Sequence, residues 1–427
     1  MNIKNIILKL LPAVLVLLTS CMNETDDIFN QKPDERRDEV FENCRSTLTN
    51  ASNGWVMRYF ITPESGGINM LASFDNQGLV KVAANNMYTS NSFREAESRY
   101  AMMQEGGPML TFITYNNVLH AFSDPDLHSG VSLGGDFEFM IFDVTDEQIA
   151  LQGKRSHANF IMTKMPDNIK WQDYLQELSD MVQTLFSPGS PDLTLKVEDK
   201  SYTFSDGETS AFSVIENGVD TAKVQKLPFV ITEKGLYLYA PEELSGAGAQ
   251  TFELNEEKSA LVSVENPDVR LSGPNNQAPY FSNNQTSIWE IDIDNASPSI
   301  TALYNRIAKF CADNYQSEKT TLAIAYTTAR RMFSLRLIML RNGGRQSIQG
   351  NLDMVLSHDG ANTVTFAATG EGDANAMTFV SRINGYEELS KLISKSFRIS
   401  TKSVINPLDM RFTQSDGTEV WFQTVRQ

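Results

Sequence analysis

The chain contains little cysteine and little histidine, with three and four of these residues among 427. None of them belongs to a C-x-x-C or H-E-x-x-H pattern, and no P-loop or S-x-x-K motif occurs. Each of these motifs sets nucleophiles, metal ligands or phosphate-binding groups at a fixed spacing on one local structure. We therefore expect no recognisable catalytic residue, no metal site and no cofactor.

Positive charge is also scarce. The chain has 36 Lys and Arg residues against 53 Asp and Glu residues, which gives a formal net charge of −17. Loss of an N-terminal segment that carries Lys4 and Lys9 changes this to −17 − 2 = −19. Such a charge repels nucleic acid and anionic lipid head groups. We expect no nucleic-acid partner.

Long apolar runs are absent as well. The apolar stretch Leu10 to Leu18 is interrupted by Pro12, and the later stretch SLRLIMLR is interrupted by Arg336. A helix that spans a bilayer needs roughly 20 apolar residues. Neither stretch is long enough, so any membrane association has to come from another feature.

That feature lies at the N-terminus. Lys4 and Lys9 precede the apolar stretch and small residues follow it, which is the pattern of a secretory signal peptide over residues 1–20. Leu18-Thr19-Ser20-Cys21 resembles a bacterial lipobox, in which Cys21 becomes the first mature residue and its thiol carries a diacylglyceryl group. Acyl chains added at this residue anchor a protein stably when there are two or more. An ordinary secreted protein is the alternative.

Residues 21–33 form a tether in this interpretation. Its acidic tract, Asn23 to Asp27, resembles the surface-export signal of Bacteroidota lipoproteins, and a plain solvated linker is the alternative. Cys44 and Cys311 are the cysteines that remain. Both lie on apolar faces of predicted helices, which favours buried thiols, although an oxidising compartment also permits a disulfide.

Most of the chain is predicted to form short antiparallel strands. Alternating runs such as FEFMIF and GLYLYA are separated by hairpin-type turns that contain glycine. Helices are expected over residues 34–48 and 169–186, from Ser297-Pro298 onward, and after Gly385, because apolar residues recur there at helical spacing. The fold class is therefore a β-rich α+β protein.

Four features recur at nearly constant offsets of 215, 216, 215 and 210 residues. They pair hairpins that begin at Gly135 and Gly350, apolar strands that begin at Ala158 and Ala374, helices that begin at Trp171 and Tyr386, and turns at Asp206 and Asp416. We expect a tandem duplication into two related barrel- or sandwich-like domains, 34–215 and 216–427, each with a helix before its last strand. The alternative is that hairpins and helices recur in any α+β protein.

Three stretches carry a family resemblance. NASNGWVMRYF from Asn50, GGPMLTFITYNNVLHAFSDPD from Gly106 and DFEFMIF from Asp136 resemble an uncharacterised family of Bacteroidota lipoproteins, domain-of-unknown-function family 4302. The resemblance implies an outer-membrane lipoprotein, of a kind often associated with nutrient-uptake loci. It brings no established activity and no functional residues.

Two patterns invite a chemical interpretation. Gly130 to Gly134 matches G-x-S-x-G, but no strand precedes it and no helix follows, as a nucleophile elbow requires. Asp124, Asp126 and His128 offer hard ligands to a divalent ion, but Asp-Pro-Asp is also common turn chemistry. A third group, Glu290 to Asp294, alternates acidic residues with isoleucine as the wet face of a half-buried strand does.

The segment 272–287 has no periodicity and is rich in Gly, Pro, Asn and Gln, so a loop is expected. Aromatic faces beside amides suit carbohydrate ligands, and the candidate ligand-binding residues are Tyr280, Phe281, Asn283 and Asn284. The alternative is that these rings pin the loop to its domain.

The most economical function is a lipid-anchored binding protein of the outer membrane. It is expected at the cell surface, with the periplasmic face as the alternative, and would capture a glycan or peptide for an uptake complex. A hydrolase of unrecognised type and a structural or adhesive scaffold are the rival interpretations. A hydrolase should show clustered, pKa-shifted carboxylates or histidines, a binder an open cleft, and a scaffold a large apolar patch.

Overall fold

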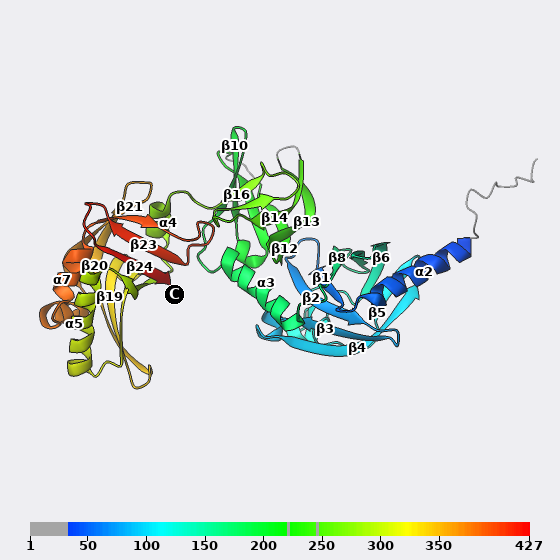
Figure 1. The fold of residues 1–427 in the computed structure, drawn as a ribbon, viewed down its shortest axis with the longest axis horizontal. Coiled ribbons are helices and arrows are strands. Elements are labelled where there is room, and N and C mark those ends of the chain that lie inside the picture. Colours follow the sequence, from blue (N-terminus) through cyan, green and yellow to red (C-terminus); the bar gives the residue numbers. More distant parts are fainter. Residues whose placement is uncertain (1–32, 220–222, 245–246) are drawn as a thin grey trace, which may run out of the picture.

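The strands that the structure describes form three closed antiparallel barrels, which lie in a row in Figure 1. The structure, a computed structural model, describes residues 33–219, 223–244 and 247–427. The predicted signal peptide, Cys21 and the acidic tract lie outside these residues. Among the described helices, none is both long and apolar enough to cross a membrane.

The first barrel is a meander in which each strand pairs with the next and β1 pairs with β8 to close the sheet. Its strands are β1 (Trp55–Phe60), β2 (Gly67–Phe74), β3 (Leu79–Ala84), β4 (Arg94–Gln104), β5 (Pro108–Phe112), β6 (Glu138–Val144), β7 (Gln148–Gly153) and β8 (Asn159–Lys164).

The second barrel repeats this order and closes by the pairing of β16 with β9 at Ser272 and Thr194. Its strands are β9 (Leu193–Val197), β10 (Lys200–Ser205), β11 (Ala211–Glu216), β12 (Gln225–Thr232), β13 (Gly235–Leu244), β14 (Ala247–Leu254), β15 (Ala260–Ser263) and β16 (Arg270–Ser272).

The third barrel closes by the pairing of β17 with β24. Its strands are β17 (Ile288–Ala296), β18 (Lys319–Thr327), β19 (Met332–Arg341), β20 (Gln346–His358), β21 (Thr363–Gly372), β22 (Ser396–Ser400), β23 (Asp409–Gln414) and β24 (Trp421–Arg426).

The four helices expected from helical spacing are present. They are α2 (Pro33–Asn50), α3 (Trp171–Leu185), α5 (Pro298–Tyr315) and α7 (Tyr386–Ile393), and two further helices are α4 (Gln277–Asn283) and α6 (Ala374–Arg382). Cys44 on α2 and Cys311 on α5 are buried free thiols, in agreement with the preferred interpretation. Burial raises the pKa of Cys311 to about 11.

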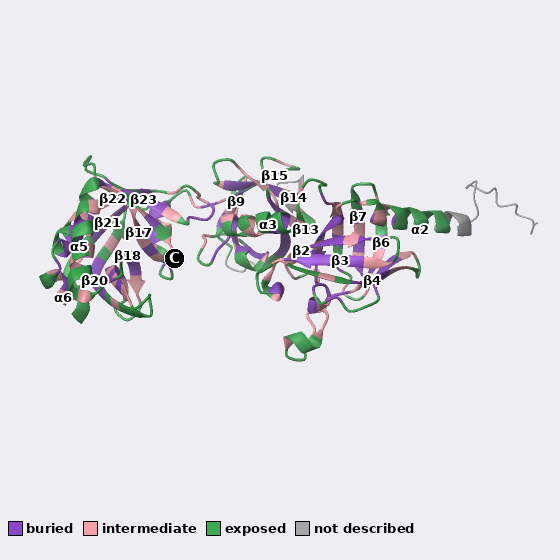
Figure 2. Ribbon diagram, turned by 60° about the horizontal axis from the view of Figure 1, so that its bottom comes forward, coloured by how far each residue is buried: buried purple, intermediate pink, exposed green. Residues whose placement is uncertain are grey.

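Apolar side chains at every second position of the strands point into the barrels and form their cores. In β19, Phe333, Leu335, Leu337 and Met339 face the core while Arg336 and Ile338 are only half-buried, as period-2 geometry requires. Figure 2 shows the buried residues along the strands and the exposed outer faces of α2 and α6. Each barrel therefore has a packed apolar core.

The β-rich fold with tandem antiparallel barrels is confirmed, but the repeating unit is one eight-strand barrel and there are three of them. The predicted boundary at 215/216 falls at the end of β11, which pairs with β12 in the same sheet. Gly135 precedes the sixth strand of its barrel, whereas Gly350 lies in the fourth strand of another. The features matched at an offset near 215 residues therefore belong to strands that are not equivalent in their barrels.

Two local expectations also need correction. Ala374 begins α6 and no strand, because Asp373 caps the helix by accepting a hydrogen bond from the amide of Ala376. In neither predicted domain does the helix directly precede the last strand of a barrel. α3 connects the first two barrels, and α7 lies between β21 and β22.

The first and second barrels share an interface with a packed centre. Val230 of β12 is fully buried and belongs to the core cluster of the first barrel. The rings of Phe60 and Tyr239 meet edge to face at 5.0 Å, and Asn69 Nδ2 donates a hydrogen bond of 2.7 Å to the carbonyl of Ile231. α3 packs its Tyr174 on the outside of the first barrel and its Leu185 in the core of the second.

The third barrel joins the second through the segment 401–408, which connects β22 and β23. Ile405 is fully buried in the core cluster of the second barrel. The amides of Val404 and Ile405 both donate to the carbonyl of Lys258, at 3.0 and 3.1 Å. A side chain from the third barrel thus completes the core of the second.

Removal of that side chain tests this assignment. Ile405→Ala should cost about 2–5 kcal/mol of stability, as large-to-small changes in packed cores do, and should lower the thermal unfolding midpoint of the second barrel. The matched control is Leu408→Ala in the same segment, where the side chain is 40% exposed; its effect should stay within about 0.5 kcal/mol. Equal effects of the two substitutions would show that Ile405 is not part of the core of the second barrel.

Candidate functional site

A cleft opens in the third barrel where two neighbouring strands separate. β17 and β18 pair at only three positions, and the last of these is Glu290 with Ala323. Beyond it β17 continues beside β24 with an irregular register, while β18 keeps its full pairing with β19. α5, which connects the two strands, packs against both of them at this point. The separation leaves a wedge-shaped space over the helix.

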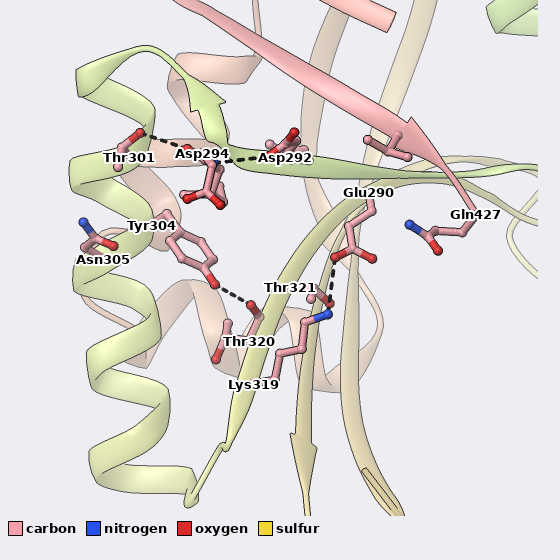
Figure 3. Close-up of a pocket in the computed structure, with 13 residues that line it drawn as sticks. Glu290, Asp292, Asp294, Thr301, Tyr304, Asn305, Lys319, Thr320, Thr321 and Gln427 are labelled. Carbon is pink, nitrogen blue, oxygen red and sulfur yellow. Dashed lines mark hydrogen bonds and ion pairs between the residues drawn. The ribbon is translucent and has the colours of Figure 1, made fainter. Parts of the chain in front are cut away.

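The cleft has a volume of about 550 Å³, and polar and apolar atoms share its lining about equally. That volume is within the range of ligand pockets, roughly 300–1,000 Å³. Figure 3 shows the lining side chains, which come from β17, α5, the start of β18 and the end of β24. They are Glu290, Ile291, Asp292, Ile293, Asp294, Thr301, Tyr304, Asn305, Lys319, Thr320, Thr321, Val425 and Gln427.

One wall of the cleft carries a row of carboxylates. Glu290, Asp292 and Asp294 alternate with Ile291 and Ile293 along β17, and Ile291 is buried while Asp294 is exposed. The sequence interpretation of this stretch as the wet face of a half-buried strand is thus confirmed. Because the side chains on one face recur every second residue, the three carboxylates follow one edge of the cleft.

The polar groups of this wall are only partly engaged. Lys319 Nζ lies 3.8 Å from Glu290 Oε1, a long contact between an exposed lysine and a half-buried glutamate, which contributes little stability. Asp292 accepts hydrogen bonds from the amide of Asp294 at 3.2 Å and from Asn295 Nδ2 at 2.8 Å. The row therefore retains acceptor capacity that faces solvent.

The helix side of the cleft is held by two side chains of α5. Tyr304 OH donates a hydrogen bond of 2.6 Å to the carbonyl of Thr320, and Thr301 Oγ1 donates one of 3.4 Å to the carbonyl of Ile293. These bonds tie α5 to both separated strands, as Figure 3 shows. Burial, and then the charge of Glu290, raises the pKa of Tyr304, so its hydroxyl stays protonated and acts as a donor.

A second, smaller cavity of about 140 Å³ lies at the end of the second barrel and has Asp192, Asp206 and Glu208 in its lining. Partial burial and then the charges of Asp206 and Glu208 raise the pKa of Asp192. Within the described ranges, no three His, Cys, Asp or Glu side chains are arranged to hold a metal ion. The cavity is also below the usual size of a ligand pocket.

The four residues proposed from the sequence for ligand capture do not line either cavity. The segment expected to be a loop contains α4, and Phe281 of this helix is fully buried. Its ring lies 5.2 Å from that of Phe412 and 5.5 Å from that of Trp289. The interpretation of Phe281 as an exposed stacking face is therefore wrong, and the alternative of packing holds for this residue.

Tyr280 and Asn284 instead take part in the junction between the second and third barrels. Tyr280 OH donates to the carbonyl of Gly189 at 2.7 Å, and Asn284 Nδ2 donates to Tyr280 OH at 3.1 Å. Arg426 Nη1 also donates to Tyr280 OH, at 2.7 Å. Asn283, the fourth residue of the set, is exposed. Tyr280, Asn284 and Arg426 therefore stabilise the junction.

The remaining sequence motifs are turns. Asp124 caps the 3₁₀ helix η3 (Pro125–His128) by accepting a hydrogen bond of 3.0 Å from the amide of Asp126, and it also accepts one of 2.7 Å from Tyr115 OH. Ser132 of the G-x-S-x-G stretch accepts a hydrogen bond from the amide of Gly134. The turn interpretation of both stretches agrees with these contacts.

Sequence reasoning missed the cleft, although it had found part of its lining. Tyr304 is one of the apolar residues that recur at helical spacing in this helix, and its ring packs against the core cluster of the third barrel. The signal that the sequence offered was the acidic row of β17 followed at once by Ser297-Pro298 and a long helix. Here α5 is inserted between β17 and β18, which pair at only three positions.

Comparisons with known proteins identify a family but no activity. The family model described as "Domain of unknown function (DUF4302)" matches residues 25–256, which is 232 of 427 residues. No curated protein matches the chain.

Solved structures give distant similarities. The β subunit of DNA polymerase from Streptococcus pyogenes is 10% identical, with 91% of this chain and 97% of that chain covered and a TM-score of 0.14. DNA polymerase III subunit β from Borrelia burgdorferi is 10% identical, with 92% and 97% covered and a TM-score of 0.13. TM-scores this low carry no structural or functional argument.

The packing role of Phe281 gives a direct test. Phe281→Ala should cost about 3–5 kcal/mol, because the change leaves a cavity among several aromatic rings, and the third barrel should unfold at a lower denaturant concentration. Asn283→Ala, two residues further along the same helix, removes an exposed side chain and should change stability by less than about 0.5 kcal/mol. A small effect of Phe281→Ala would show that the ring is not a core element.

Proposed function

This chain belongs to the family described as a domain of unknown function (DUF4302), and we propose that it is a lipid-anchored binding protein of the outer membrane. The observation that carries the binding role is the open cleft between β17, β18 and α5. The lipid anchor is proposed from the N-terminal sequence. Capture of a nutrient for an uptake complex is the function that connects the two.

The cleft suits recognition of a polar ligand. Its carboxylates accept hydrogen bonds, Lys319 donates them, and the amide of Asn305 does both. The ring of Tyr304 adds an apolar surface that is already fixed by its bond to the carbonyl of Thr320. Fixed side chains lose little conformational entropy on binding. A glycan or a peptide fits this combination.

Membrane attachment is proposed through Cys21. A thiol is the nucleophile that accepts the diacylglyceryl group, and the lipobox-like residues before it define the cleavage site. The acidic tract after it supports exposure at the cell surface. Residues 21–33 then form a tether that ends where α2 begins.

The anchor makes a prediction in cells of a bacterium that processes lipoproteins. Wild-type protein should incorporate an alkyne analogue of palmitate and sediment with membranes, whereas Cys21→Ala should lose both properties because the acceptor thiol is gone. Cys44→Ala is the control, since Cys44 is buried in α2, and its labelling should equal that of the wild type. Undiminished labelling of Cys21→Ala would exclude the anchor.

The cleft makes a second prediction. Asn305→Trp should fill the cleft and weaken binding of whichever probe the wild type retains, by at least about tenfold or 1.4 kcal/mol. Suitable probes are maltoheptaose, xylohexaose and an array of short peptides, applied to the full mature chain and measured by calorimetry. Asp313→Asn on the same helix is the control, because Asp313 pairs with Lys309 and does not line the cleft.

The outcomes separate the rival functions. Binding that Asn305→Trp abolishes supports capture in the cleft, and turnover of a bound probe would favour the hydrolase. Binding that is unchanged in Asn305→Trp places the ligand elsewhere and contradicts the proposed site.

A further inference from the structure

The cleft exposes the edge of a strand as well as side chains. β17 loses β18 as a partner after Glu290, although it continues for six residues to Ala296. Four of these, Ile291 to Asp294, line the cleft. On the other side, Lys319 to Leu322 of β18 precede the first residue that pairs with β17. The edges of β17 and β18 therefore both border the cleft. In a continuous sheet these two edges would be hydrogen-bonded to each other.

The direction of the backbone groups follows from the pairing on the opposite side. The carbonyl of Ile288 accepts a hydrogen bond from the amide of Gln427, so the main-chain groups of Ile288 face β24. Because these groups alternate in direction along the regularly paired part of the strand, those of Ile291 face the cleft. The hydrogen bond from Thr301 to the carbonyl of Ile293 agrees with this direction.

We propose that the cleft binds an extended basic peptide, which adds to the edge of β17 as an extra strand. The inference rests on the proposed function of the cleft as a capture site and specifies the ligand class. Strand addition is a recognised mode of peptide binding, in which main-chain hydrogen bonds supply affinity and alternate side chains supply specificity. A glycan has no repeating amide and carbonyl groups with which to match such an edge.

The charge of the site selects basic side chains. Three carboxylates and one lysine line the cleft, and the whole chain carries a formal charge of −17. Glu290 and Asp292 project from one face of β17, and Asp294 follows where the register with β24 shifts; all three carboxylates line the cleft. A peptide paired with this strand directs its own alternate residues to the same face, so lysine or arginine at every second position meets the row.

The intervening residues of the peptide face α5. The ring of Tyr304 lies there, fixed by its hydrogen bond to β18, and offers a surface for small apolar side chains. The four cleft-lining residues of β17 extend about 13 Å at the rise of a strand. The expected ligand is therefore a segment of about four to six residues with alternating basic and apolar side chains.

The test uses a fluorescein-labelled peptide of sequence KVKVKV and the full mature chain, with Cys21→Ser to keep it free of lipid. Fluorescence anisotropy should show binding that weakens with added salt, because the contact pairs opposite exposed charges. Asp292→Asn combined with Asp294→Asn should reduce the affinity at least tenfold. Asp313→Asn should leave it unchanged, and the melting temperatures of all variants should confirm folding.

Two further peptides separate strand addition from simple charge attraction. The permuted peptide KKKVVV has the same composition but the wrong alternation, and it should bind at least tenfold more weakly. N-methylation of the three lysines or of the three valines removes alternate amide donors. One of these two isomers should retain binding and the other should lose it, because only one set of amides faces β17.

The possible failures are distinct. Equal binding of KVKVKV, KKKVVV and both methylated isomers would overturn strand addition. Binding of an oligosaccharide that Asn305→Trp abolishes, with no binding of KVKVKV, would refute the peptide inference and leave the capture role intact. If neither class binds in the cleft, both proposals fail together.

Discussion

Closure of each strand meander onto its own first strand is the constraint on which this structure depends. A closed barrel leaves no unpaired edge, and all three barrels close between their first and last strands. In the third barrel, β17 pairs with β24 on one side. On its other side β17 pairs with β18 at only three positions, and α5 lies between these two strands in the sequence. The cleft and the exposed edge of β17 lie where α5 is inserted, and the sequence of β17 supplies the acidic wall.

The barrels are joined in two different ways. The first and second share packed apolar side chains and the helix α3, whereas the third is held to the second by polar contacts around Arg426 and by one inserted segment. Arg426 Nη2 donates to Asn406 Oδ1 at 2.7 Å, and Asn406 Nδ2 donates to the carbonyl of Gln183 at the end of α3. The family match over residues 25–256 covers the first barrel and most of the second.

The sequence patterns predicted the helices well, but they did not predict which strands pair with one another. The spacing of apolar residues located α2, α3, α5 and α7, because one helical face must be buried wherever the helix docks. The number of barrels was beyond the same reasoning, since alternation tells which face of a strand is buried and nothing about which strand lies beside it. Phe281 shows the same limit. Its polar neighbours predicted a loop, and only the surrounding aromatic rings of distant strands explain its burial.

The insertion of Ile405 also constrains the order in which the chain completes its structure. Most strand pairs here join neighbours in sequence, an arrangement that favours rapid local folding as the chain emerges N-terminus first. The second barrel ends at Ser272, yet a residue 133 positions later fills its core. Until that residue is in place, the core of the second barrel lacks one of its fully buried side chains, so this barrel reaches its final packing only after most of the third has been synthesised.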